Sequence, residues 1–92
     1  VGNLIGKGAL LGSTITTTTG VKIGSFSFVG SSTSIGEGVE IGPGAQIGMG
    51  SLVLKNIKSG CFVLGNPLRM LDKIEVPETI IEEWEKIKII NN

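Results

Sequence analysis

Few side chains in this chain of 92 residues could act directly in catalysis. It contains no histidine, so it can build neither a histidine-ligated metal site nor a triad that depends on imidazole. Glu37 and Glu40 are the only carboxylates in residues 1–71, and either could act as a general base if it were removed from water. Exposed glutamates are ordinary, however, so no catalytic residue is assigned. Cys61 stands among apolar residues, which favours a buried thiol over a nucleophile.

The charged residues are distributed unevenly. Residues 1–71 hold five cations and two carboxylates, whereas residues 72–92 hold three cations and six carboxylates. Two interpretations remain open: a solvated acidic tail beside a mildly basic segment, or a segment that keeps its cations for a phosphorylated ligand. The net charge of zero argues against binding to nucleic acid. A single cysteine and the lack of a long apolar run predict a cytoplasmic protein that has no membrane partner.

A six-residue repeat must position these side chains. Its first position is aliphatic in every hexad but one, as Ile5, Leu11, Thr17, Ile23, Val29, Ile35, Ile41, Ile47 and Val53 show. The second position is glycine in most hexads: Gly6, Gly12, Gly24, Gly30, Gly36, Gly42 and Gly48. The fifth position is small or β-branched in all of them: Ala9, Ile15, Val21, Ser27, Thr33, Val39, Ala45, Ser51 and Ile57. This register predicts a regular repeat from Ile5 to Lys58.

A period of six suits short strands joined by corners. The aliphatic residue would point inward from a strand, and the glycine beside it would permit the backbone angles of a corner. Three edges close a triangle, so nine hexads predict three coils, each made of three hexads, in an all-β fold. Successive coils would pair as parallel strands and stack equivalent residues in three columns. The columns are Ile5–Ile23–Ile41, Leu11–Val29–Ile47 and Thr17–Ile35–Val53.

The segment "IGEGVE IGPGAQ IGMGSL" resembles the bacterial transferase hexapeptide-repeat family, and so do "VLKNI" and "GNPLR" further along the chain. The resemblance is to the C-terminal part of sugar O- or N-acyltransferases such as the sialic acid O-acetyltransferase group. It implies a left-handed parallel β-helix and an enzyme that moves an acetyl group from acetyl-CoA to a sugar or nucleotide-sugar hydroxyl or amine. It also implies a homotrimer with the active site between neighbouring helices. The family's histidine base is missing here, so this chain alone would be inactive.

The resemblance places cofactor contacts in the last coils and at the exit from the repeat. Ser31 and Met49 are three hexads apart and would stack just after a corner glycine, with N–H groups facing the pantetheine arm. Lys55 and Arg69 would approach the phosphates of CoA. The implied cofactor-binding residues are Gly30, Ser31, Gly48, Met49, Leu54, Lys55 and Arg69.

Two domains are expected: the repeat with its exit turn over residues 1–71, and a helical tail over 72–92. A helix is predicted from about Pro77 to about Lys88, with an apolar stripe of Ile80, Trp84 and Ile87 and with Ile81 beside it. The stripe would dock on the end or side of the coils, or on a neighbouring subunit. The chain begins midway through a hexad, which suggests the C-terminal portion of a longer domain.

Two further functions remain open. A non-catalytic structural or trimerisation module would explain the missing histidine. A γ-type carbonic anhydrase shares the implied fold, but it needs three histidine ligands to its metal. Phe26 and Phe28 stand at outward positions of the repeat, and an exposed aromatic pair favours a subunit interface over a ligand site.

Overall fold

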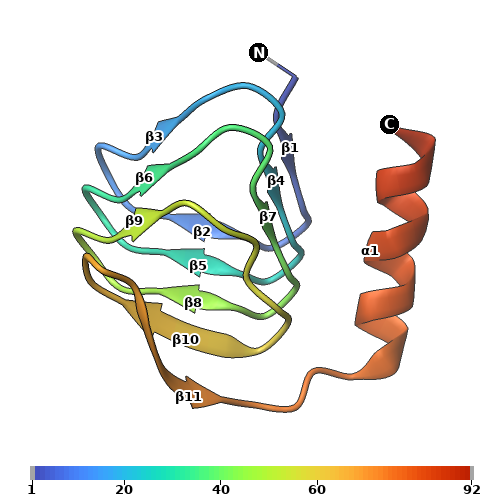
Figure 1. Cartoon of the computed structure of the whole chain (residues 1–92). Helices are drawn as coiled ribbons and strands as arrows, with labels where there is room; N and C mark the ends of the chain where they lie inside the picture. The colour runs from blue at the N-terminus through green and yellow to red at the C-terminus, as the bar shows by residue number, and fades with distance from the viewer. Residues whose placement is uncertain (1, 92) are drawn as a thin grey trace.

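The computed structural model describes residues 2–91, which form a triangular solenoid with one helix along its side (Figure 1). Nine two-residue strands make the regular coils: β1 (Leu4–Ile5), β2 (Leu10–Leu11), β3 (Thr16–Thr17), β4 (Lys22–Ile23), β5 (Phe28–Val29), β6 (Ser34–Ile35), β7 (Glu40–Ile41), β8 (Gln46–Ile47) and β9 (Leu52–Val53). They are followed by β10 (Cys61–Leu64), β11 (Arg69–Lys73) and α1 (Glu78–Ile90).

The strands stack into three sheets that form the sides of a left-handed parallel β-helix. Sheet A contains β1, β4 and β7, sheet C contains β3, β6 and β9, and sheet B contains β2, β5, β8, β10 and β11. Ile5 pairs with Ile23, and Ile23 pairs with Ile41, so successive coils are offset by three hexads. The other two columns follow the same register. The three predicted columns and the predicted fold class are therefore confirmed.

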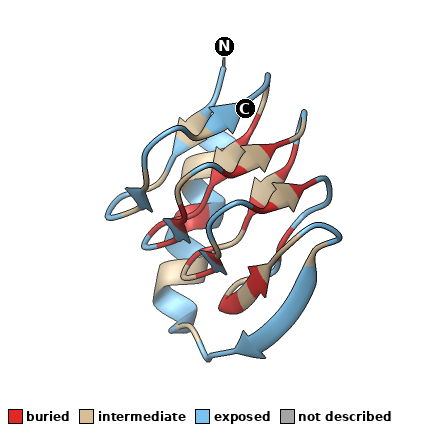
Figure 2. Cartoon of the chain, turned by 90° about the vertical axis from the view of Figure 1, so that its left-hand side faces the viewer, coloured by how far each residue is buried: buried red, intermediate tan, exposed pale blue. Residues whose placement is uncertain are grey.

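The interior is filled by two residues from every hexad. Figure 2 shows that the buried residues concentrate in the middle coils. Ile23, Ile41 and Ile47 are at most 1% exposed, whereas Ile5 in the first coil is 51% exposed. The small fifth residues also point inward, and their hydroxyl groups bond to corner carbonyls: Ser27 Oγ donates to the Gly42 oxygen at 2.9 Å. Within residues 2–91, no buried side-chain polar atom lacks a hydrogen-bond partner.

The predicted role of the corner glycines was wrong. The left-handed backbone lies two residues further along each regular corner, for example at Gly20 (φ 76°) and Gly38 (φ 70°). The glycine after the aliphatic residue is required by close approach instead. A Cβ on Gly30 would lie 2.5 Å from the Met49 nitrogen and 2.7 Å from its Cα, in the coil beneath. Only hydrogen fits between backbones that are stacked so tightly.

The predicted register up to Lys58 was also wrong in its last hexad. Ile57 does not take the fifth position; it pairs with Ile41, two residues short of the regular offset, and is 6% exposed in the aliphatic column. Two residues are thus missing from the corner after Val53. Asn56 compensates, because its Oδ1 accepts a hydrogen bond from the Glu40 N–H at 2.9 Å. Val63 then pairs with Ile47, so an incomplete fourth coil follows the third.

The chain leaves the repeat through residues 65–68 and turns back as β11, which pairs antiparallel with β10. The peptide bond between Asn66 and Pro67 is cis. β11 runs across the expected domain boundary after residue 71 and is exposed along its length. It forms the edge of sheet B at the C-terminal end of the solenoid, opposite the first coil (Figure 1).

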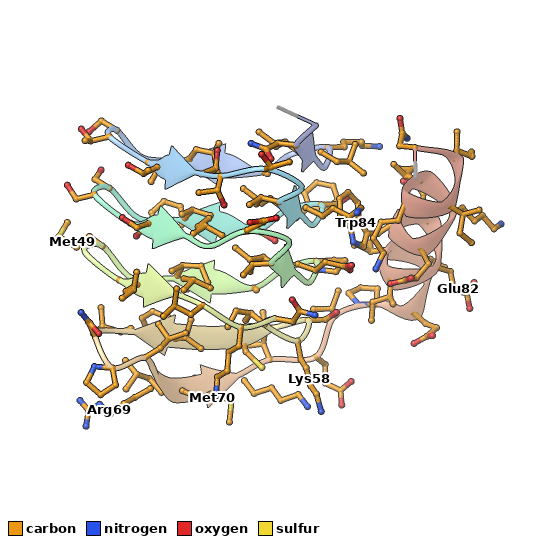
Figure 3. The ribbon with its side chains drawn as sticks, turned by 45° about the horizontal axis from the view of Figure 1, so that its top comes forward. Met49, Lys58, Arg69, Met70, Glu82 and Trp84 are labelled. Carbon is orange, nitrogen blue, oxygen red and sulfur yellow. The ribbon has the colours of Figure 1, made fainter. Side chains whose placement is uncertain are left out.

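Helix α1 lies along the side of the solenoid next to sheet A (Figure 1). Trp84 points from it toward the coils and is 1% exposed, whereas Glu82 points away from them (Figure 3). Ile80, Ile81 and Ile87 are half-buried beside Trp84, which confirms the predicted stripe. Lys88 Nζ lies 2.8 Å from Glu40 Oε1 of β7 and 3.1 Å from Glu85 Oε2. The helix therefore covers the side of its own solenoid.

Candidate functional site

Four of the expected cofactor residues lie together on one edge of the solenoid. We call this the B–C edge, because its corners, residues 12–14, 30–32 and 48–50, join sheet B to sheet C. Gly30 and Gly48 occupy the tight position of successive corners, and Ser31 and Met49 follow them. Ser31 is half-buried, while Met49 is 71% exposed. The structure thus stacks Gly30, Ser31, Gly48 and Met49 in one column, as the sequence indicated.

The B–C edge carries backbone donors that the fold leaves free. In the two middle corners of this edge the third residue bonds to the coil above: Ser32 N–H donates to the Ser13 oxygen at 3.0 Å, and Gly50 N–H donates to the Ser31 oxygen at 2.9 Å. The preceding N–H groups, those of Ser31 and Met49, donate no hydrogen bond within residues 2–91. They lie one coil apart, a spacing of about 4.8 Å for paired parallel strands. An extended molecule with regularly spaced acceptors would match them.

The exit turn continues the same edge. Leu64 follows Val63 as Gly48 follows Ile47, and the Leu64 side chain lies directly against Gly48. Gly65 N–H donates to Ser51 Oγ at 3.0 Å, which fixes the turn beneath the third coil. Arg69 begins β11 opposite Leu64 and is exposed. Arg69 therefore stands at the lower end of the column of Ser31 and Met49, and Figure 3 shows it beneath Met49.

Leu54 and Lys55 lie on a different edge, at the corner between sheets C and A. Both are exposed, and the Leu54 side chain contacts Gly36 of the coil above. A hollow of about 290 Å³ connects this corner to the exit turn, with Leu52, Leu54, Lys55, Asn66, Pro67 and Leu68 as its lining. The expected set is therefore divided between two edges, and the last coil joins them.

A second hollow, of about 320 Å³, opens at the C-terminal end of the solenoid. Lys55 and Leu68 line it as well as the first one, so the two hollows lie next to each other. Its remaining lining residues are Asn56, Ile57, Lys58, Cys61, Val63, Arg69 and Met70. Figure 3 shows Arg69, Met70 and Lys58 at this end of the molecule. The sequence interpretation missed Lys58 and Met70, because the wrong register kept Lys58 inside a regular coil.

Neither glutamate of the coils is placed to act as a base. Glu37 is exposed to water, and Glu40 is paired with Lys88 beneath α1. Burial opposes the charge of Lys88, but the hydrogen bonds and charges of Glu40 and Glu85 outweigh it and hold the pKa of Lys88 above its ordinary 10.5. Cys61 is 6% exposed on β10, as expected of an inert thiol. Residues 2–91 contain no group of acidic, cysteine or histidine side chains that could hold a metal ion.

Comparison with protein families matches residues 19–55 to the bacterial transferase hexapeptide (six repeats). The matched segment ends at Lys55, where the corner loses two residues. Comparison with curated proteins found no significant match.

Solved structures with hexapeptide-repeat folds superpose on most of this chain. A galactoside acetyltransferase in complex with coenzyme A is 26% identical, with a TM-score of 0.74 over 79% of this chain and 46% of its own. A variant of perosamine N-acetyltransferase from Caulobacter crescentus, in complex with CoA and GDP-perosamine, is 24% identical, with a TM-score of 0.74 over 77% of this chain and 34% of its own. UDP-N-acetylglucosamine acyltransferase from Campylobacter jejuni is 22% identical, with a TM-score of 0.74 over 94% of this chain and 37% of its own.

These relatives are acyltransferases, and two of the three hold CoA. The chain spans less than half of the length of each of them. Among residues 2–91, no helix has the length and apolar character needed to cross a membrane.

Proposed function

We propose that this chain binds the acyl donor of an acetyl-CoA-dependent acyltransferase whose acceptor is a hydroxyl or amine of a sugar or nucleotide sugar. Gly30, Ser31, Gly48, Met49, Leu54, Lys55 and Arg69 form the donor site in this proposal. No residue of the chain is assigned as the base, so the chain by itself is expected to bind acetyl-CoA without turning it over. The single free cysteine is compatible with the cytoplasm, where we place the reaction.

One observation carries the proposal: the free N–H groups of Ser31 and Met49 repeat at the rise of the coils. The pantetheine arm of CoA has two amide carbonyls separated by four bonds, which is about 5 Å when extended. This separation matches the inter-strand rise of about 4.8 Å. Successive corners could therefore donate to both carbonyls of one extended arm.

Lys55 and Arg69 lie at a distance from the free N–H groups of Ser31 and Met49 that suits the length of CoA. About thirteen bonds separate the outer phosphorus of CoA from its sulfur, which is about 15 Å when extended. Three coil spacings, from the exit turn beside Arg69 up to the first coil, come to about 14 Å. Phosphates held by Lys55 and Arg69 would thus place the sulfur near the first coil. Neither cation has a carboxylate within ion-pair distance among residues 2–91.

A homotrimer belongs to the proposal, with subunits meeting over sheet B. Sheet A is less suited to the contact, because it faces α1. Sheet C is less suited as well, because its outward residues include the polar Thr16 and Ser34. The outward row of sheet B contains Leu10 and Phe28, which are 66% and 44% exposed, and ends at Phe62. Aromatic and aliphatic side chains of this kind are enriched at the centres of interfaces. A neighbouring subunit packed on sheet B would form a cleft, with the B–C edge as one of its sides.

The test is calorimetric titration of the chain with acetyl-CoA, after light scattering has established its oligomeric state. Replacing Lys55 or Arg69 with alanine should weaken binding by about fivefold to tenfold, as expected for partly exposed contacts to phosphate. Lys7→Ala is the matched control, because Lys7 carries the same charge in the first coil, far from the exit turn. It should leave the affinity within about twofold.

Failure to bind acetyl-CoA by a trimer would refute the donor site and favour the alternative, a non-catalytic structural or trimerisation module. Equal losses from Lys7→Ala and Lys55→Ala would mean that only general charge attracts the cofactor. Donor binding that is lost only in the Lys55 and Arg69 variants supports the site as described.

A further inference from the structure

The shortened corner after β9, residues 54–56, is fastened by a side chain where the coils above it use the backbone. One coil higher, Lys22 N–H donates to the Val39 oxygen at 3.0 Å. The equivalent N–H group in the third coil belongs to Glu40, and it donates to Asn56 Oδ1 at 2.9 Å. A side-chain oxygen therefore takes the place of the carbonyl that the shortened corner no longer supplies.

This bond is the main attachment of the corner. In the regular corner above it, Gly38 N–H donates to the Thr19 oxygen at 3.0 Å. Among residues 2–91, the bond to Asn56 Oδ1 is the only hydrogen bond that involves residues 54–56. Lys55 belongs to this corner and is exposed, so packing does little to hold it. The position of Lys55 therefore depends largely on one side chain.

Glu40 also connects this corner to helix α1. Its carboxylate oxygen Oε1 lies 2.8 Å from Lys88 Nζ, and the Lys88 side chain is only 20% exposed. Trp84, one turn earlier in α1, is 1% exposed and keeps this part of the helix against the solenoid. Asn56, Glu40 and Lys88 line one cavity of about 280 Å³ between α1 and the coils. The corner thus holds the backbone of Glu40, and the helix holds its carboxylate.

We propose that Asn56 is a positioning residue for the donor site: it sets the place of Lys55, and α1 supports it through Lys88 and Glu40. The inference rests on the proposed function, in which Lys55 contacts the phosphates of the donor. Asn56 itself contacts no part of the donor. Without its bond the corner loses its fixed position, and binding then has to order the corner as well, which lowers the affinity.

The first test is a double-mutant cycle measured by calorimetric titration with acetyl-CoA. Asn56→Leu removes the acceptor at nearly unchanged size and should weaken binding about fivefold, close to the loss expected for Lys55→Ala. In the Lys55→Ala background, Asn56→Leu should change the affinity by less than about 1.5-fold, because a residue that acts through Lys55 has nothing left to act on. Asn56→Asp keeps an acceptor oxygen and should bind within about twofold of the parent chain.

Asn3→Leu is the matched control. Asn3 is exposed as well, and its Oδ1 accepts a hydrogen bond from the Val21 N–H at 3.0 Å in the first coil. Urea denaturation should show a similar loss of stability in Asn3→Leu and Asn56→Leu, because each loses one bond to a backbone N–H. Only Asn56→Leu should lose affinity for acetyl-CoA.

The second test needs no ligand and follows the contribution of the helix. Lys88→Met should shift the amide resonances of Glu40 and of residues 54–56 in nitrogen-15 NMR spectra, because it frees the Glu40 carboxylate. Lys86→Met is the control on the same helix, since Lys86 is exposed and forms no ion pair within residues 2–91. It should leave those resonances in place.

The outcomes separate this inference from the proposed function. If the parent chain does not bind acetyl-CoA, the donor site is wrong and the positioning role falls with it. If the parent binds and Asn56→Leu binds equally well, the donor site stands and the role of Asn56 is overturned. Equal losses from Asn56→Leu with and without Lys55 would also overturn it, as general disruption. Unchanged resonances of residues 54–56 in Lys88→Met would remove α1 from the proposal, even if Asn56→Leu did not fold.

Discussion

The two kinds of corner glycine should respond differently to a methyl group, and Gly24→Ala is the sharpest case. Gly24 has no left-handed backbone, but a Cβ there would lie 2.6 Å from the carbonyl carbon of Gly42 and 2.8 Å from the oxygen of Ile41. It would come closer still to the nitrogen of Pro43. All three atoms belong to the backbone of the next coil, which has no side-chain torsion through which it could move away.

The cost follows from the required displacement. An ordinary contact begins near 3.4 Å, so the two coils must separate locally by several tenths of an ångström. The hydrogen bond from Gly24 N–H to the Ile41 oxygen, 2.7 Å long, lies at the same point and would be stretched toward the limit of its range. Overpacking costs about 1–3 kcal/mol and a weakened buried hydrogen bond costs about 1 kcal/mol. We therefore expect Gly24→Ala to reduce the free energy of unfolding by about 3 kcal/mol.

Two glycines provide matched controls. Gly36 occupies the same hexad position, but the one tight contact of a Cβ there is with the flexible Leu54 side chain at 3.2 Å, and the nearest backbone atom, the Val53 oxygen, lies at an ordinary 3.5 Å. Gly36→Ala should therefore change stability by less than about 0.5 kcal/mol. Gly38 has φ 70° with nothing within 4 Å, so Gly38→Ala should cost only the left-handed strain of about 1 kcal/mol. Urea denaturation followed by circular dichroism measures all three. Equal losses for Gly24→Ala and Gly36→Ala would refute close approach as the reason for the second hexad position.

Three further predictions concern the helix and the strained corners. Trp84→Ala removes the one fully buried side chain of α1, and a truncated buried tryptophan costs about 3–5 kcal/mol; we expect faster proteolysis between Ile74 and Pro77, with the strand signal in circular dichroism retained. Lys88→Met removes the contacts to Glu40 and Glu85 and should lower stability by about 0.5–1 kcal/mol near neutral pH, measured by urea denaturation. Thr14 has φ 59° without being glycine, so Thr14→Gly should raise the melting temperature, by relief of about 1 kcal/mol of strain.

The Lys88 prediction has a definite pH dependence. The pKa of Lys88 is raised in the folded chain, so its contribution is complete below its ordinary 10.5 and is lost as the pH rises through the higher folded value. The stability difference between the parent chain and Lys88→Met should therefore shrink above about pH 10.5. A difference that stayed constant to higher pH would show that packing of the lysine stem, rather than its charge, holds the helix end.

Periodicity was the most informative signal in the sequence, because a β-helix repeats its packing as strictly as its residues. Ile5, Ile23 and Ile41 stack as the spacing required. The periodicity also concealed the shortened corner, since Ile57 suits both the first and the fifth position of a hexad. Only the pairing of Ile57 with Ile41, and the substitution of Asn56 Oδ1 for a backbone acceptor, reveal that two residues are missing.

The site was less predictable than the fold for a different reason. Which corner a residue belongs to follows from counting, so Ser31 and Met49 were stacked correctly. Whether Lys55 reaches the same place as Arg69 depends on how the last coil ends, and the exit turn brings both to one hollow. The docking of helix α1 was limited in the same way. Its apolar stripe was evident from Trp84 and its neighbours, but nothing in the sequence showed whether the stripe docks on the end of the solenoid or on its side.

The uniform offset between the paired strands of the three regular coils also has a kinetic consequence. Each new coil must close a loop of the same length before it gains any pairing, so every step of growth meets a similar entropic barrier. The second and third coils, in which every strand except β9 has a paired neighbour on both sides, hold nearly all of the buried aliphatic residues and are the natural nucleus. Folding should then proceed from this nucleus toward both ends of the solenoid, one coil after another. Amide hydrogens should exchange fastest in β1 to β3 and slowest in β4 to β8, in an order set by distance from that nucleus rather than by position in the chain.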